Sequence, residues 1–121
     1  MFDVTADARA NRLYITLDGT MDVDETSDAR DASLDGADSL RDGFDVVTDI
    51  SGFTPPTPEA AEPIKEAQAG LRDRGVDRVV RVTGDDASAV VTNAFQRRSR
   101  DDGYTGETAE SRDEADRILD A

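Results

Sequence analysis

The stretch that most constrains the fold of this chain is residues 44–50, which read FDVVTDI. A nearly continuous apolar run of this length is typical of a strand that is covered on both faces, as in the centre of a parallel sheet. Patterns typical of helices lie on both sides of this run along the chain. Because alternating strands and helices favour a mostly parallel sheet with right-handed crossovers, we expect an α/β domain.

Apolar periodicity divides the rest of the chain into further strands and helices. Strands are expected at 2–5, 13–17, 76–82 and 103–108, and helices at 22–42, from about 60 to 74, at 87–95 and from 111 onward. A start near residue 60 would keep Pro63 in the first turn of its helix, where proline is tolerated. Asp22 or Asp24 is the expected cap of the first helix, and Ser111 with Glu114 forms a capping box at the last. The whole chain, 1–121, is thus expected to be one domain with a mixed, mostly parallel sheet of four to five strands and about four helices.

Acidic residues dominate the composition. The chain has 28 Asp and Glu against 14 Lys and Arg, a formal net charge of −14, and Lys65 is the single lysine. Such charge is also typical of disordered chains, but here the apolar residues collect into strand and helix patterns. We therefore expect a folded domain with an acidic surface, of the kind carried by proteins of salt-loving, haloarchaeal-type microbes. In molar salt the Debye length falls to about 3 Å, so salt should stabilise this fold by screening the carboxylates.

The chain contains neither cysteine nor histidine. Disulfides, thiolate zinc sites, thiol nucleophiles and catalysis by serine–histidine or cysteine–histidine pairs are therefore excluded. We expect no catalytic residue, no metal and no cofactor. The negative charge disfavours nucleic acids and anionic membranes as partners, since both are negatively charged themselves. The N-terminal segment lacks a signal-peptide pattern and no apolar run approaches the roughly 20 residues of a membrane span, so we expect a cytoplasmic protein.

One short motif suggests an enzyme. Residues 22–26, DVDET, have the D-x-D-x-T spacing of magnesium-dependent phosphatases of the haloacid-dehalogenase type, and Lys65 and the turn 84–86 follow in the right order. That motif belongs directly at the end of a strand, however, whereas residues 19–21 intervene here. Since acids are so frequent in this chain, solvated carboxylates at a helix start are the favoured interpretation. A small phosphatase remains the alternative.

A segment rich in threonine and proline, TPPTP at residues 54–58, follows the central strand. We expect residues 51–58 to form a loop that leads into the next helix. One interpretation is a surface that binds a partner protein, with the turn at 83–86 as an additional contact. Another is a plain connection, in which Thr57 caps the helix and the prolines stiffen the chain. The candidate partner-binding residues are Asp49, Ser51, Thr54, Thr57 and Glu59.

Four segments in this order carry a family resemblance: LYITLDGTMD (13–22), GFDVVTDISGF (43–53), RGVDRVVRV (74–82) and SRDEADRIL (111–119). Over nearly its whole length the chain resembles the STAS domains, the anti-sigma-factor-antagonist family, including its SpoIIAA-like relatives. The resemblance implies a STAS-like fold and a non-catalytic role in signalling through protein–protein interaction. The expected partner is an unidentified regulatory protein, and the expected state is a monomer or weak homodimer. A carrier of small ligands or lipids, a role sometimes linked to STAS-like folds, is a further alternative.

The family resemblance also implies where a phosphorylation switch would lie. In signalling members, a serine at the start of the helix after the D-L-S-G-V strand is phosphorylated, and the added charge blocks docking. Aligned without gaps, that motif falls on residues 57–60, TPEA, and Pro58 occupies the acceptor position. The serine motif is therefore degenerate. Thr57 and Thr54 remain the candidate phosphorylation sites.

Overall fold

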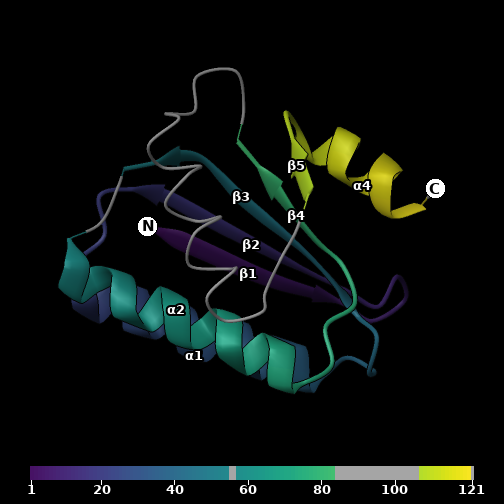
Figure 1. Cartoon of the computed structure of the whole chain (residues 1–121), viewed down its shortest axis with the longest axis horizontal. Coiled ribbons are helices and arrows are strands. Elements are labelled where there is room, and N and C mark those ends of the chain that lie inside the picture. The colour runs from purple at the N-terminus through teal and green to yellow at the C-terminus, as the bar shows by residue number, and fades with distance from the viewer. Residues whose placement is uncertain (55–56, 84–106, 121) are drawn as a thin grey trace.

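A computed structural model describes residues 1–54, 57–83 and 107–120 (Figure 1). Within these residues the strands are β1 (Phe2–Asp7), β2 (Arg12–Gly19), β3 (Asp45–Phe53), β4 (Val79–Val82) and β5 (Glu107–Ala109), and the helices are α1 (Val23–Asp38), α2 (Pro58–Asp73) and α4 (Arg112–Asp120). The strands form one sheet in the order β1-β2-β3-β4-β5. β1 pairs with β2 antiparallel, and the other three pairings are parallel. The expected α/β class with a mixed sheet is confirmed.

The helices lie in two layers on the sheet. Figure 1 shows α1 and α2 side by side over one face, and α4 at the other side of the sheet beside β4 and β5. Each of the connections β2-α1-β3 and β3-α2-β4 moves the chain by one strand, so both helices cover the same face. In the part of the chain that the structure describes there are three helices. The further helix expected at 87–95 lies outside the described residues.

Alternating side chains of the central strands serve two separate cores. Val46 and Ile50 of β3 face α1 and α2 in the larger cluster. Val47, the neighbour of Val46, faces the opposite way and packs with Val80 of β4 and Ala115 of α4. The apolar run at 44–50 is therefore covered on both faces, as its sequence predicts.

The first helix has the expected start but ends earlier than predicted. Asp22 caps α1, because its carboxylate accepts a hydrogen bond of 2.8 Å from the backbone N–H of Glu25. The helix continues unbroken through Gly36, where a Cβ would lie 2.8 Å from a methyl group of Leu13. It ends at Asp38 instead of residue 42. The Ser39 hydroxyl donates a hydrogen bond of 2.7 Å to the Gly36 carbonyl, which a continuing helix would bond to a backbone N–H.

The second helix starts two residues before the predicted position. Thr57 caps α2 by accepting a 3.2 Å hydrogen bond from the N–H of Ala60, and Pro58 occupies the first helical position, where no N–H is needed. The predicted start near residue 60 was wrong, and Pro63 consequently lies inside the helix. Proline removes one hydrogen bond from the helix. The Pro63 ring is buried, so its packing against the core offsets part of that loss.

The last part of the fold differs from prediction mainly in strand length. β4 begins at Val79, not at residue 76. The N–H of Val76 bonds to Leu71 of α2, and the N–H of Asp77 bonds to Phe44, which directly precedes β3. β5 covers Glu107–Ala109, and residues 103–106 of the predicted strand lie outside the described part of the chain.

The expected capping box at the last helix is present in a modified form. Ser111 accepts from the N–H of Glu114 at 3.1 Å, and the Glu114 carboxylate accepts from Glu110 N–H at 3.4 Å. Among the described helices, none has both the length and the apolar character that crossing a membrane would require.

Candidate functional site

The predicted partner-binding residues lie where β3 ends and α2 begins. β3 extends to Phe53, so Asp49 and Ser51 belong to the strand and the connection is shorter than the predicted loop 51–58. The extension arises because β2 shifts its register between Thr16 and Asp18 and then pairs with Gly52 and Phe53. Of the turn 83–86, only Thr83 is described.

Asp49 and Ser51 are in direct contact. One carboxylate oxygen of Asp49 accepts hydrogen bonds from the Ser51 N–H at 3.0 Å and from the Ser51 hydroxyl at 2.6 Å. Ser51 is exposed and Asp49 is half-buried. The carboxylate therefore fixes the direction of an exposed serine hydroxyl, whose remaining lone pairs are accessible from solvent.

The exposed segment around this pair is anchored at several points. Phe53 places its ring in the main core with 6 % of its surface exposed. The N–H of Thr54 donates to the Gly19 carbonyl at 3.0 Å, and Thr57 forms the cap of α2. Between these anchors the side chains of Thr54 and Thr57 are exposed, as is Glu59 in the first turn of α2. The five candidate residues thus share one end of the sheet.

Gly52 lies directly against the side chain of Asp18. A Cβ at this position would collide with the carboxylate of Asp18, the residue paired with Gly52 across the sheet. The glycine of the DISGF motif therefore allows the Asp18 side chain to lie against the end of β3. Any larger residue would make that exposed carboxylate move aside.

The phosphatase-like motif lies at the start of α1. Asp22 is the N-cap of α1, and Asp24 lies in the first turn of that helix. Met21 is buried between β2 and this helix, so the motif does not follow the strand directly. Over residues 1–54, 57–83 and 107–120, no group of three or more acidic side chains is arranged to hold a metal ion. The turn 84–86, which belongs to the same hypothesis, lies outside the described residues.

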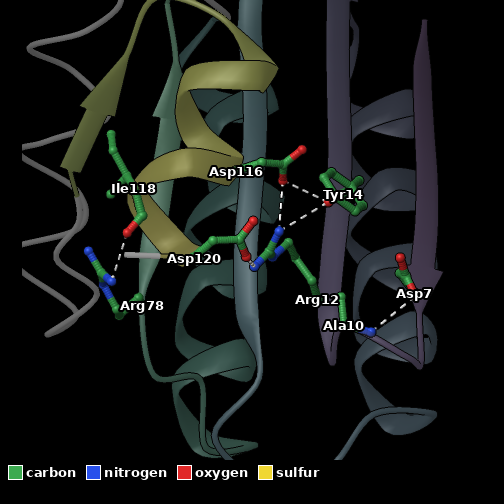
Figure 2. Close-up of polar contacts among 8 residues, drawn as sticks. All are labelled: Asp7, Ala10, Arg12, Tyr14, Arg78, Asp116, Ile118 and Asp120. Atoms are coloured by element: carbon green, nitrogen blue, oxygen red, sulfur yellow. Dashed lines mark hydrogen bonds and ion pairs between the residues drawn. The ribbon is translucent and has the colours of Figure 1, made fainter.

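A buried arginine cluster is the main feature that sequence reasoning missed (Figure 2). Arg12, whose side chain is 8 % exposed, binds Asp116 at 2.8 Å and Asp120 at 2.9 Å through its two terminal nitrogens. The hydroxyl of Tyr14 donates to the same Asp116 oxygen at 2.8 Å. The guanidinium of Arg112 lies 4.6 Å from the centre of the Tyr14 ring. These contacts fasten α4 to β2.

The pKa values of titratable groups in and beside the cluster are shifted. Burial is the main cause that raises the pKa of Tyr14, although its bond from Arg12 acts in the opposite direction. The neighbouring Asp45 also has a raised pKa, again mainly from burial, which a backbone hydrogen bond from Arg78 and the positive charges of Arg12 and Arg78 only partly offset. Arg12 begins β2, whereas the partner-binding residues lie at the other ends of these parallel strands. We therefore interpret the cluster as architectural.

Two hollows bear on the hypothesis of a small-ligand carrier. One lies between the sheet, α1 and α2 and has a volume of about 40 Å³. Sites for drug-sized ligands typically measure about 300–1,000 Å³, so this cavity is too small for a lipid. The other, of about 300 Å³, lies on the surface at the ends of α1 and α2 and is lined by charged residues such as Asp38, Asp73 and Arg74. Neither has the large apolar lining that a lipid requires.

No protein-family model matches this chain, and no curated protein is significantly similar to it. Its function is therefore inferred from its own residues.

Proposed function

We propose that this protein is a non-catalytic, regulatory protein–protein interaction module of STAS-like, anti-sigma-factor-antagonist type. The proposed contact region is the β3–α2 surface, formed by Asp49, Ser51, Thr54, Thr57 and Glu59. The observation that carries the proposal is that the described residues of this surface are largely exposed and yet held in place by hydrogen bonds and by the buried ring of Phe53. Four of its five side chains are exposed, while Phe53 between them is buried in the core.

An exposed segment of this kind is suited to binding. Association costs free energy when flexible loops must be ordered, and a surface that is already ordered avoids much of that cost. Here the Asp49–Ser51 pair, the Thr54–Gly19 hydrogen bond and the Thr57 cap each fix part of the surface. Its polar side chains offer hydroxyl and carboxylate groups to a partner without placing apolar area in solvent.

The arrangement of the described elements is consistent with the family resemblance. Two antiparallel strands are followed by parallel strands that alternate with helices, which is the order on which the resemblance rests. The DISGF motif ends the central strand, and a helix follows it directly. These features support the STAS-like interpretation.

In the proposed module the usual serine switch is replaced or absent. Pro58, at the first position of α2, has no hydroxyl to phosphorylate. Thr57 and Thr54 are both exposed, but Thr57 already uses its hydroxyl oxygen to cap the helix. Phosphorylation of either threonine is a prediction that intact-mass analysis of the protein from its native cells would test.

A comparative pull-down from native lysate in molar KCl tests the proposal. The bait carrying Thr54→Arg and Glu59→Arg should lose at least about tenfold of the captured partner, because it reverses charge and adds bulk at the β3–α2 surface. Asp73→Arg is the matched control, since it makes a similar change on an exposed residue at the far end of α2. Equal capture by all three baits, or capture of no specific protein, would contradict the proposal.

A further inference from the structure

The cavity between the sheet and the helix pair results from small side chains. Ala29 and Ser33 of α1 and Ala67 of α2 line it, where larger residues would close the space between the two helices. Much of its remaining lining is apolar, from residues such as Ile15, Ile64 and Leu71, but several polar groups also reach it, among them the buried side chain of Arg81. Thr26, Ser33 and Thr48 all contribute, together with the buried amide of Gln68.

The side chain of Gln68 lacks a hydrogen bond at this position. Its side chain is 5 % exposed, and its amide oxygen is buried without a hydrogen-bond partner. A buried acceptor in this state is costly, and in folded proteins nearly all such groups are satisfied by protein or by ordered water. A hydrogen-bond donor inside the cavity would meet the requirement.

The neighbouring hydroxyl groups could form further hydrogen bonds with a molecule that donates to Gln68. Ser33 donates its proton to the Ala29 carbonyl at 2.7 Å, and Thr26 donates to the Val23 carbonyl at 3.2 Å. The oxygens of both hydroxyls can still accept. Thr48, which reaches the cavity from β3, can donate or accept. A small molecule that donates two bonds and accepts one would therefore be well held.

The size of the cavity identifies the occupant. One water needs about 10–15 Å³ of such space, so a cavity of about 40 Å³ holds between one and about three waters. We propose that this cavity is an internal water site, in which one water donates a hydrogen bond to the amide oxygen of Gln68 and binds at least one of the neighbouring hydroxyls. This inference is independent of the proposed interaction function.

The site has an evident connection to solvent. Arg30 of α1 also lines the cavity, and it is bound to Glu66 of α2 at 3.0 Å. With 27 % of its side chain exposed, Arg30 lies between the cavity and the surface. Opening of this ion pair gives the water a route for exchange, so its residence time should be long but finite.

Magnetic relaxation dispersion of water nuclei tests the proposal, because it counts long-lived internal waters in solution. The native protein in molar KCl should show such waters, and Gln68→Leu should show fewer, because the acceptor is removed and the cavity is partly filled. Lys65→Leu is the matched control. It introduces the same leucine at an exposed position on the same helix and should leave the count unchanged.

The proposal is overturned if the native protein shows no long-lived water, or if Gln68→Leu and Lys65→Leu retain the native count. If Gln68→Leu does not fold, Gln68→Met provides a second variant with a flexible apolar chain of similar length. A high-resolution crystal structure of the unmodified protein provides an independent test. Electron density within hydrogen-bonding distance of the Gln68 amide is expected, and an empty cavity would contradict the proposal.

Discussion

The two faces of the sheet are covered by different kinds of interaction. Among the residues that the structure describes, the larger core lies against α1 and α2, with thirteen buried apolar residues, among them Leu13 and Phe44. In the same part of the chain a core of five buried residues lies against α4, and charged contacts from Arg12 and Arg78 also hold this helix. In a chain with twice as many acids as bases, a buried arginine, Arg12, thus binds two of the acids of α4. The comparison implies that the two faces differ in stability and in their response to salt and pH.

The largest effect should come from the apolar face. Leu13→Ala removes a fully buried side chain that packs between the sheet and Gly36 of α1. The free energy of unfolding should fall by about 2–5 kcal/mol, because a cavity replaces the lost contacts. Chemical denaturation in molar KCl measures this change. A loss no greater than that of a surface substitution would show that the apolar face does not dominate stability.

A smaller but more local effect is expected on the α4 face. Arg12→Met leaves Asp116, Asp120 and Tyr14 without their shared cation and should cost about 1–3 kcal/mol. Hydrogen exchange should show that α4 loses protection while α1 and α2 keep theirs.

Arg30→Met is the matched control for this prediction, because Arg30 also forms two ion pairs but is much more exposed. It should cost less than about 1 kcal/mol. Equal effects from the two variants would remove the distinction between a buried arginine and a surface arginine.

Salt should affect the stability of the two faces differently. Raising KCl from about 0.1 to about 2 M shortens the Debye length, relieves repulsion between surface carboxylates and should raise the melting temperature. The same screening weakens the exposed part of the bond between Arg12 and Asp120, whose side chain is 69 % exposed. Exchange protection in α4 should therefore rise less than protection in α1. A melting temperature that does not rise with salt would contradict the expected salt-dependent fold.

The smallest effect concerns pH at Asp45. Burial raises the pKa of this carboxyl above its ordinary value, so the folded protein binds the proton more tightly than the unfolded chain. Ionised Asp45 therefore reduces stability, and this cost is absent below the unfolded pKa and fully present above the folded one. Asp45→Asn should raise the melting temperature slightly at neutral pH. The gain should shrink as the pH is lowered towards the ordinary aspartate pKa, and a constant gain across pH would contradict this cause.

Local sequence patterns predicted the parts of the fold that depend on local chemistry. The apolar run at 44–50 identified a strand covered on both faces, and Asp22 and Ser111 identified the starts of α1 and α4. Helix and strand ends were less predictable, because tertiary contacts decide them. Val76 and Asp77 suit a strand, but their N–H groups are bound elsewhere.

The candidate site was only partly readable from sequence. Thr57 is recognisable as the threonine that precedes a helix, whereas Gly52 follows the predicted strand 44–50 but lies inside β3. The Arg12 cluster joins residues 104 and 108 positions apart, so its geometry depends on the whole sheet. One local signal was present: Asp116 and Asp120 are spaced four residues apart and so lie on the same side of α4.

The bond between Arg12 and the last helix also concerns how the chain folds during its synthesis. Arg12 emerges from the ribosome 104 and 108 residues before its partners Asp116 and Asp120. Until then Val47 and Val80 lack the helix that covers them in the finished fold. Because exposed apolar surface on a folding intermediate promotes aggregation, the growing chain passes through a vulnerable period that ends only when α4 docks.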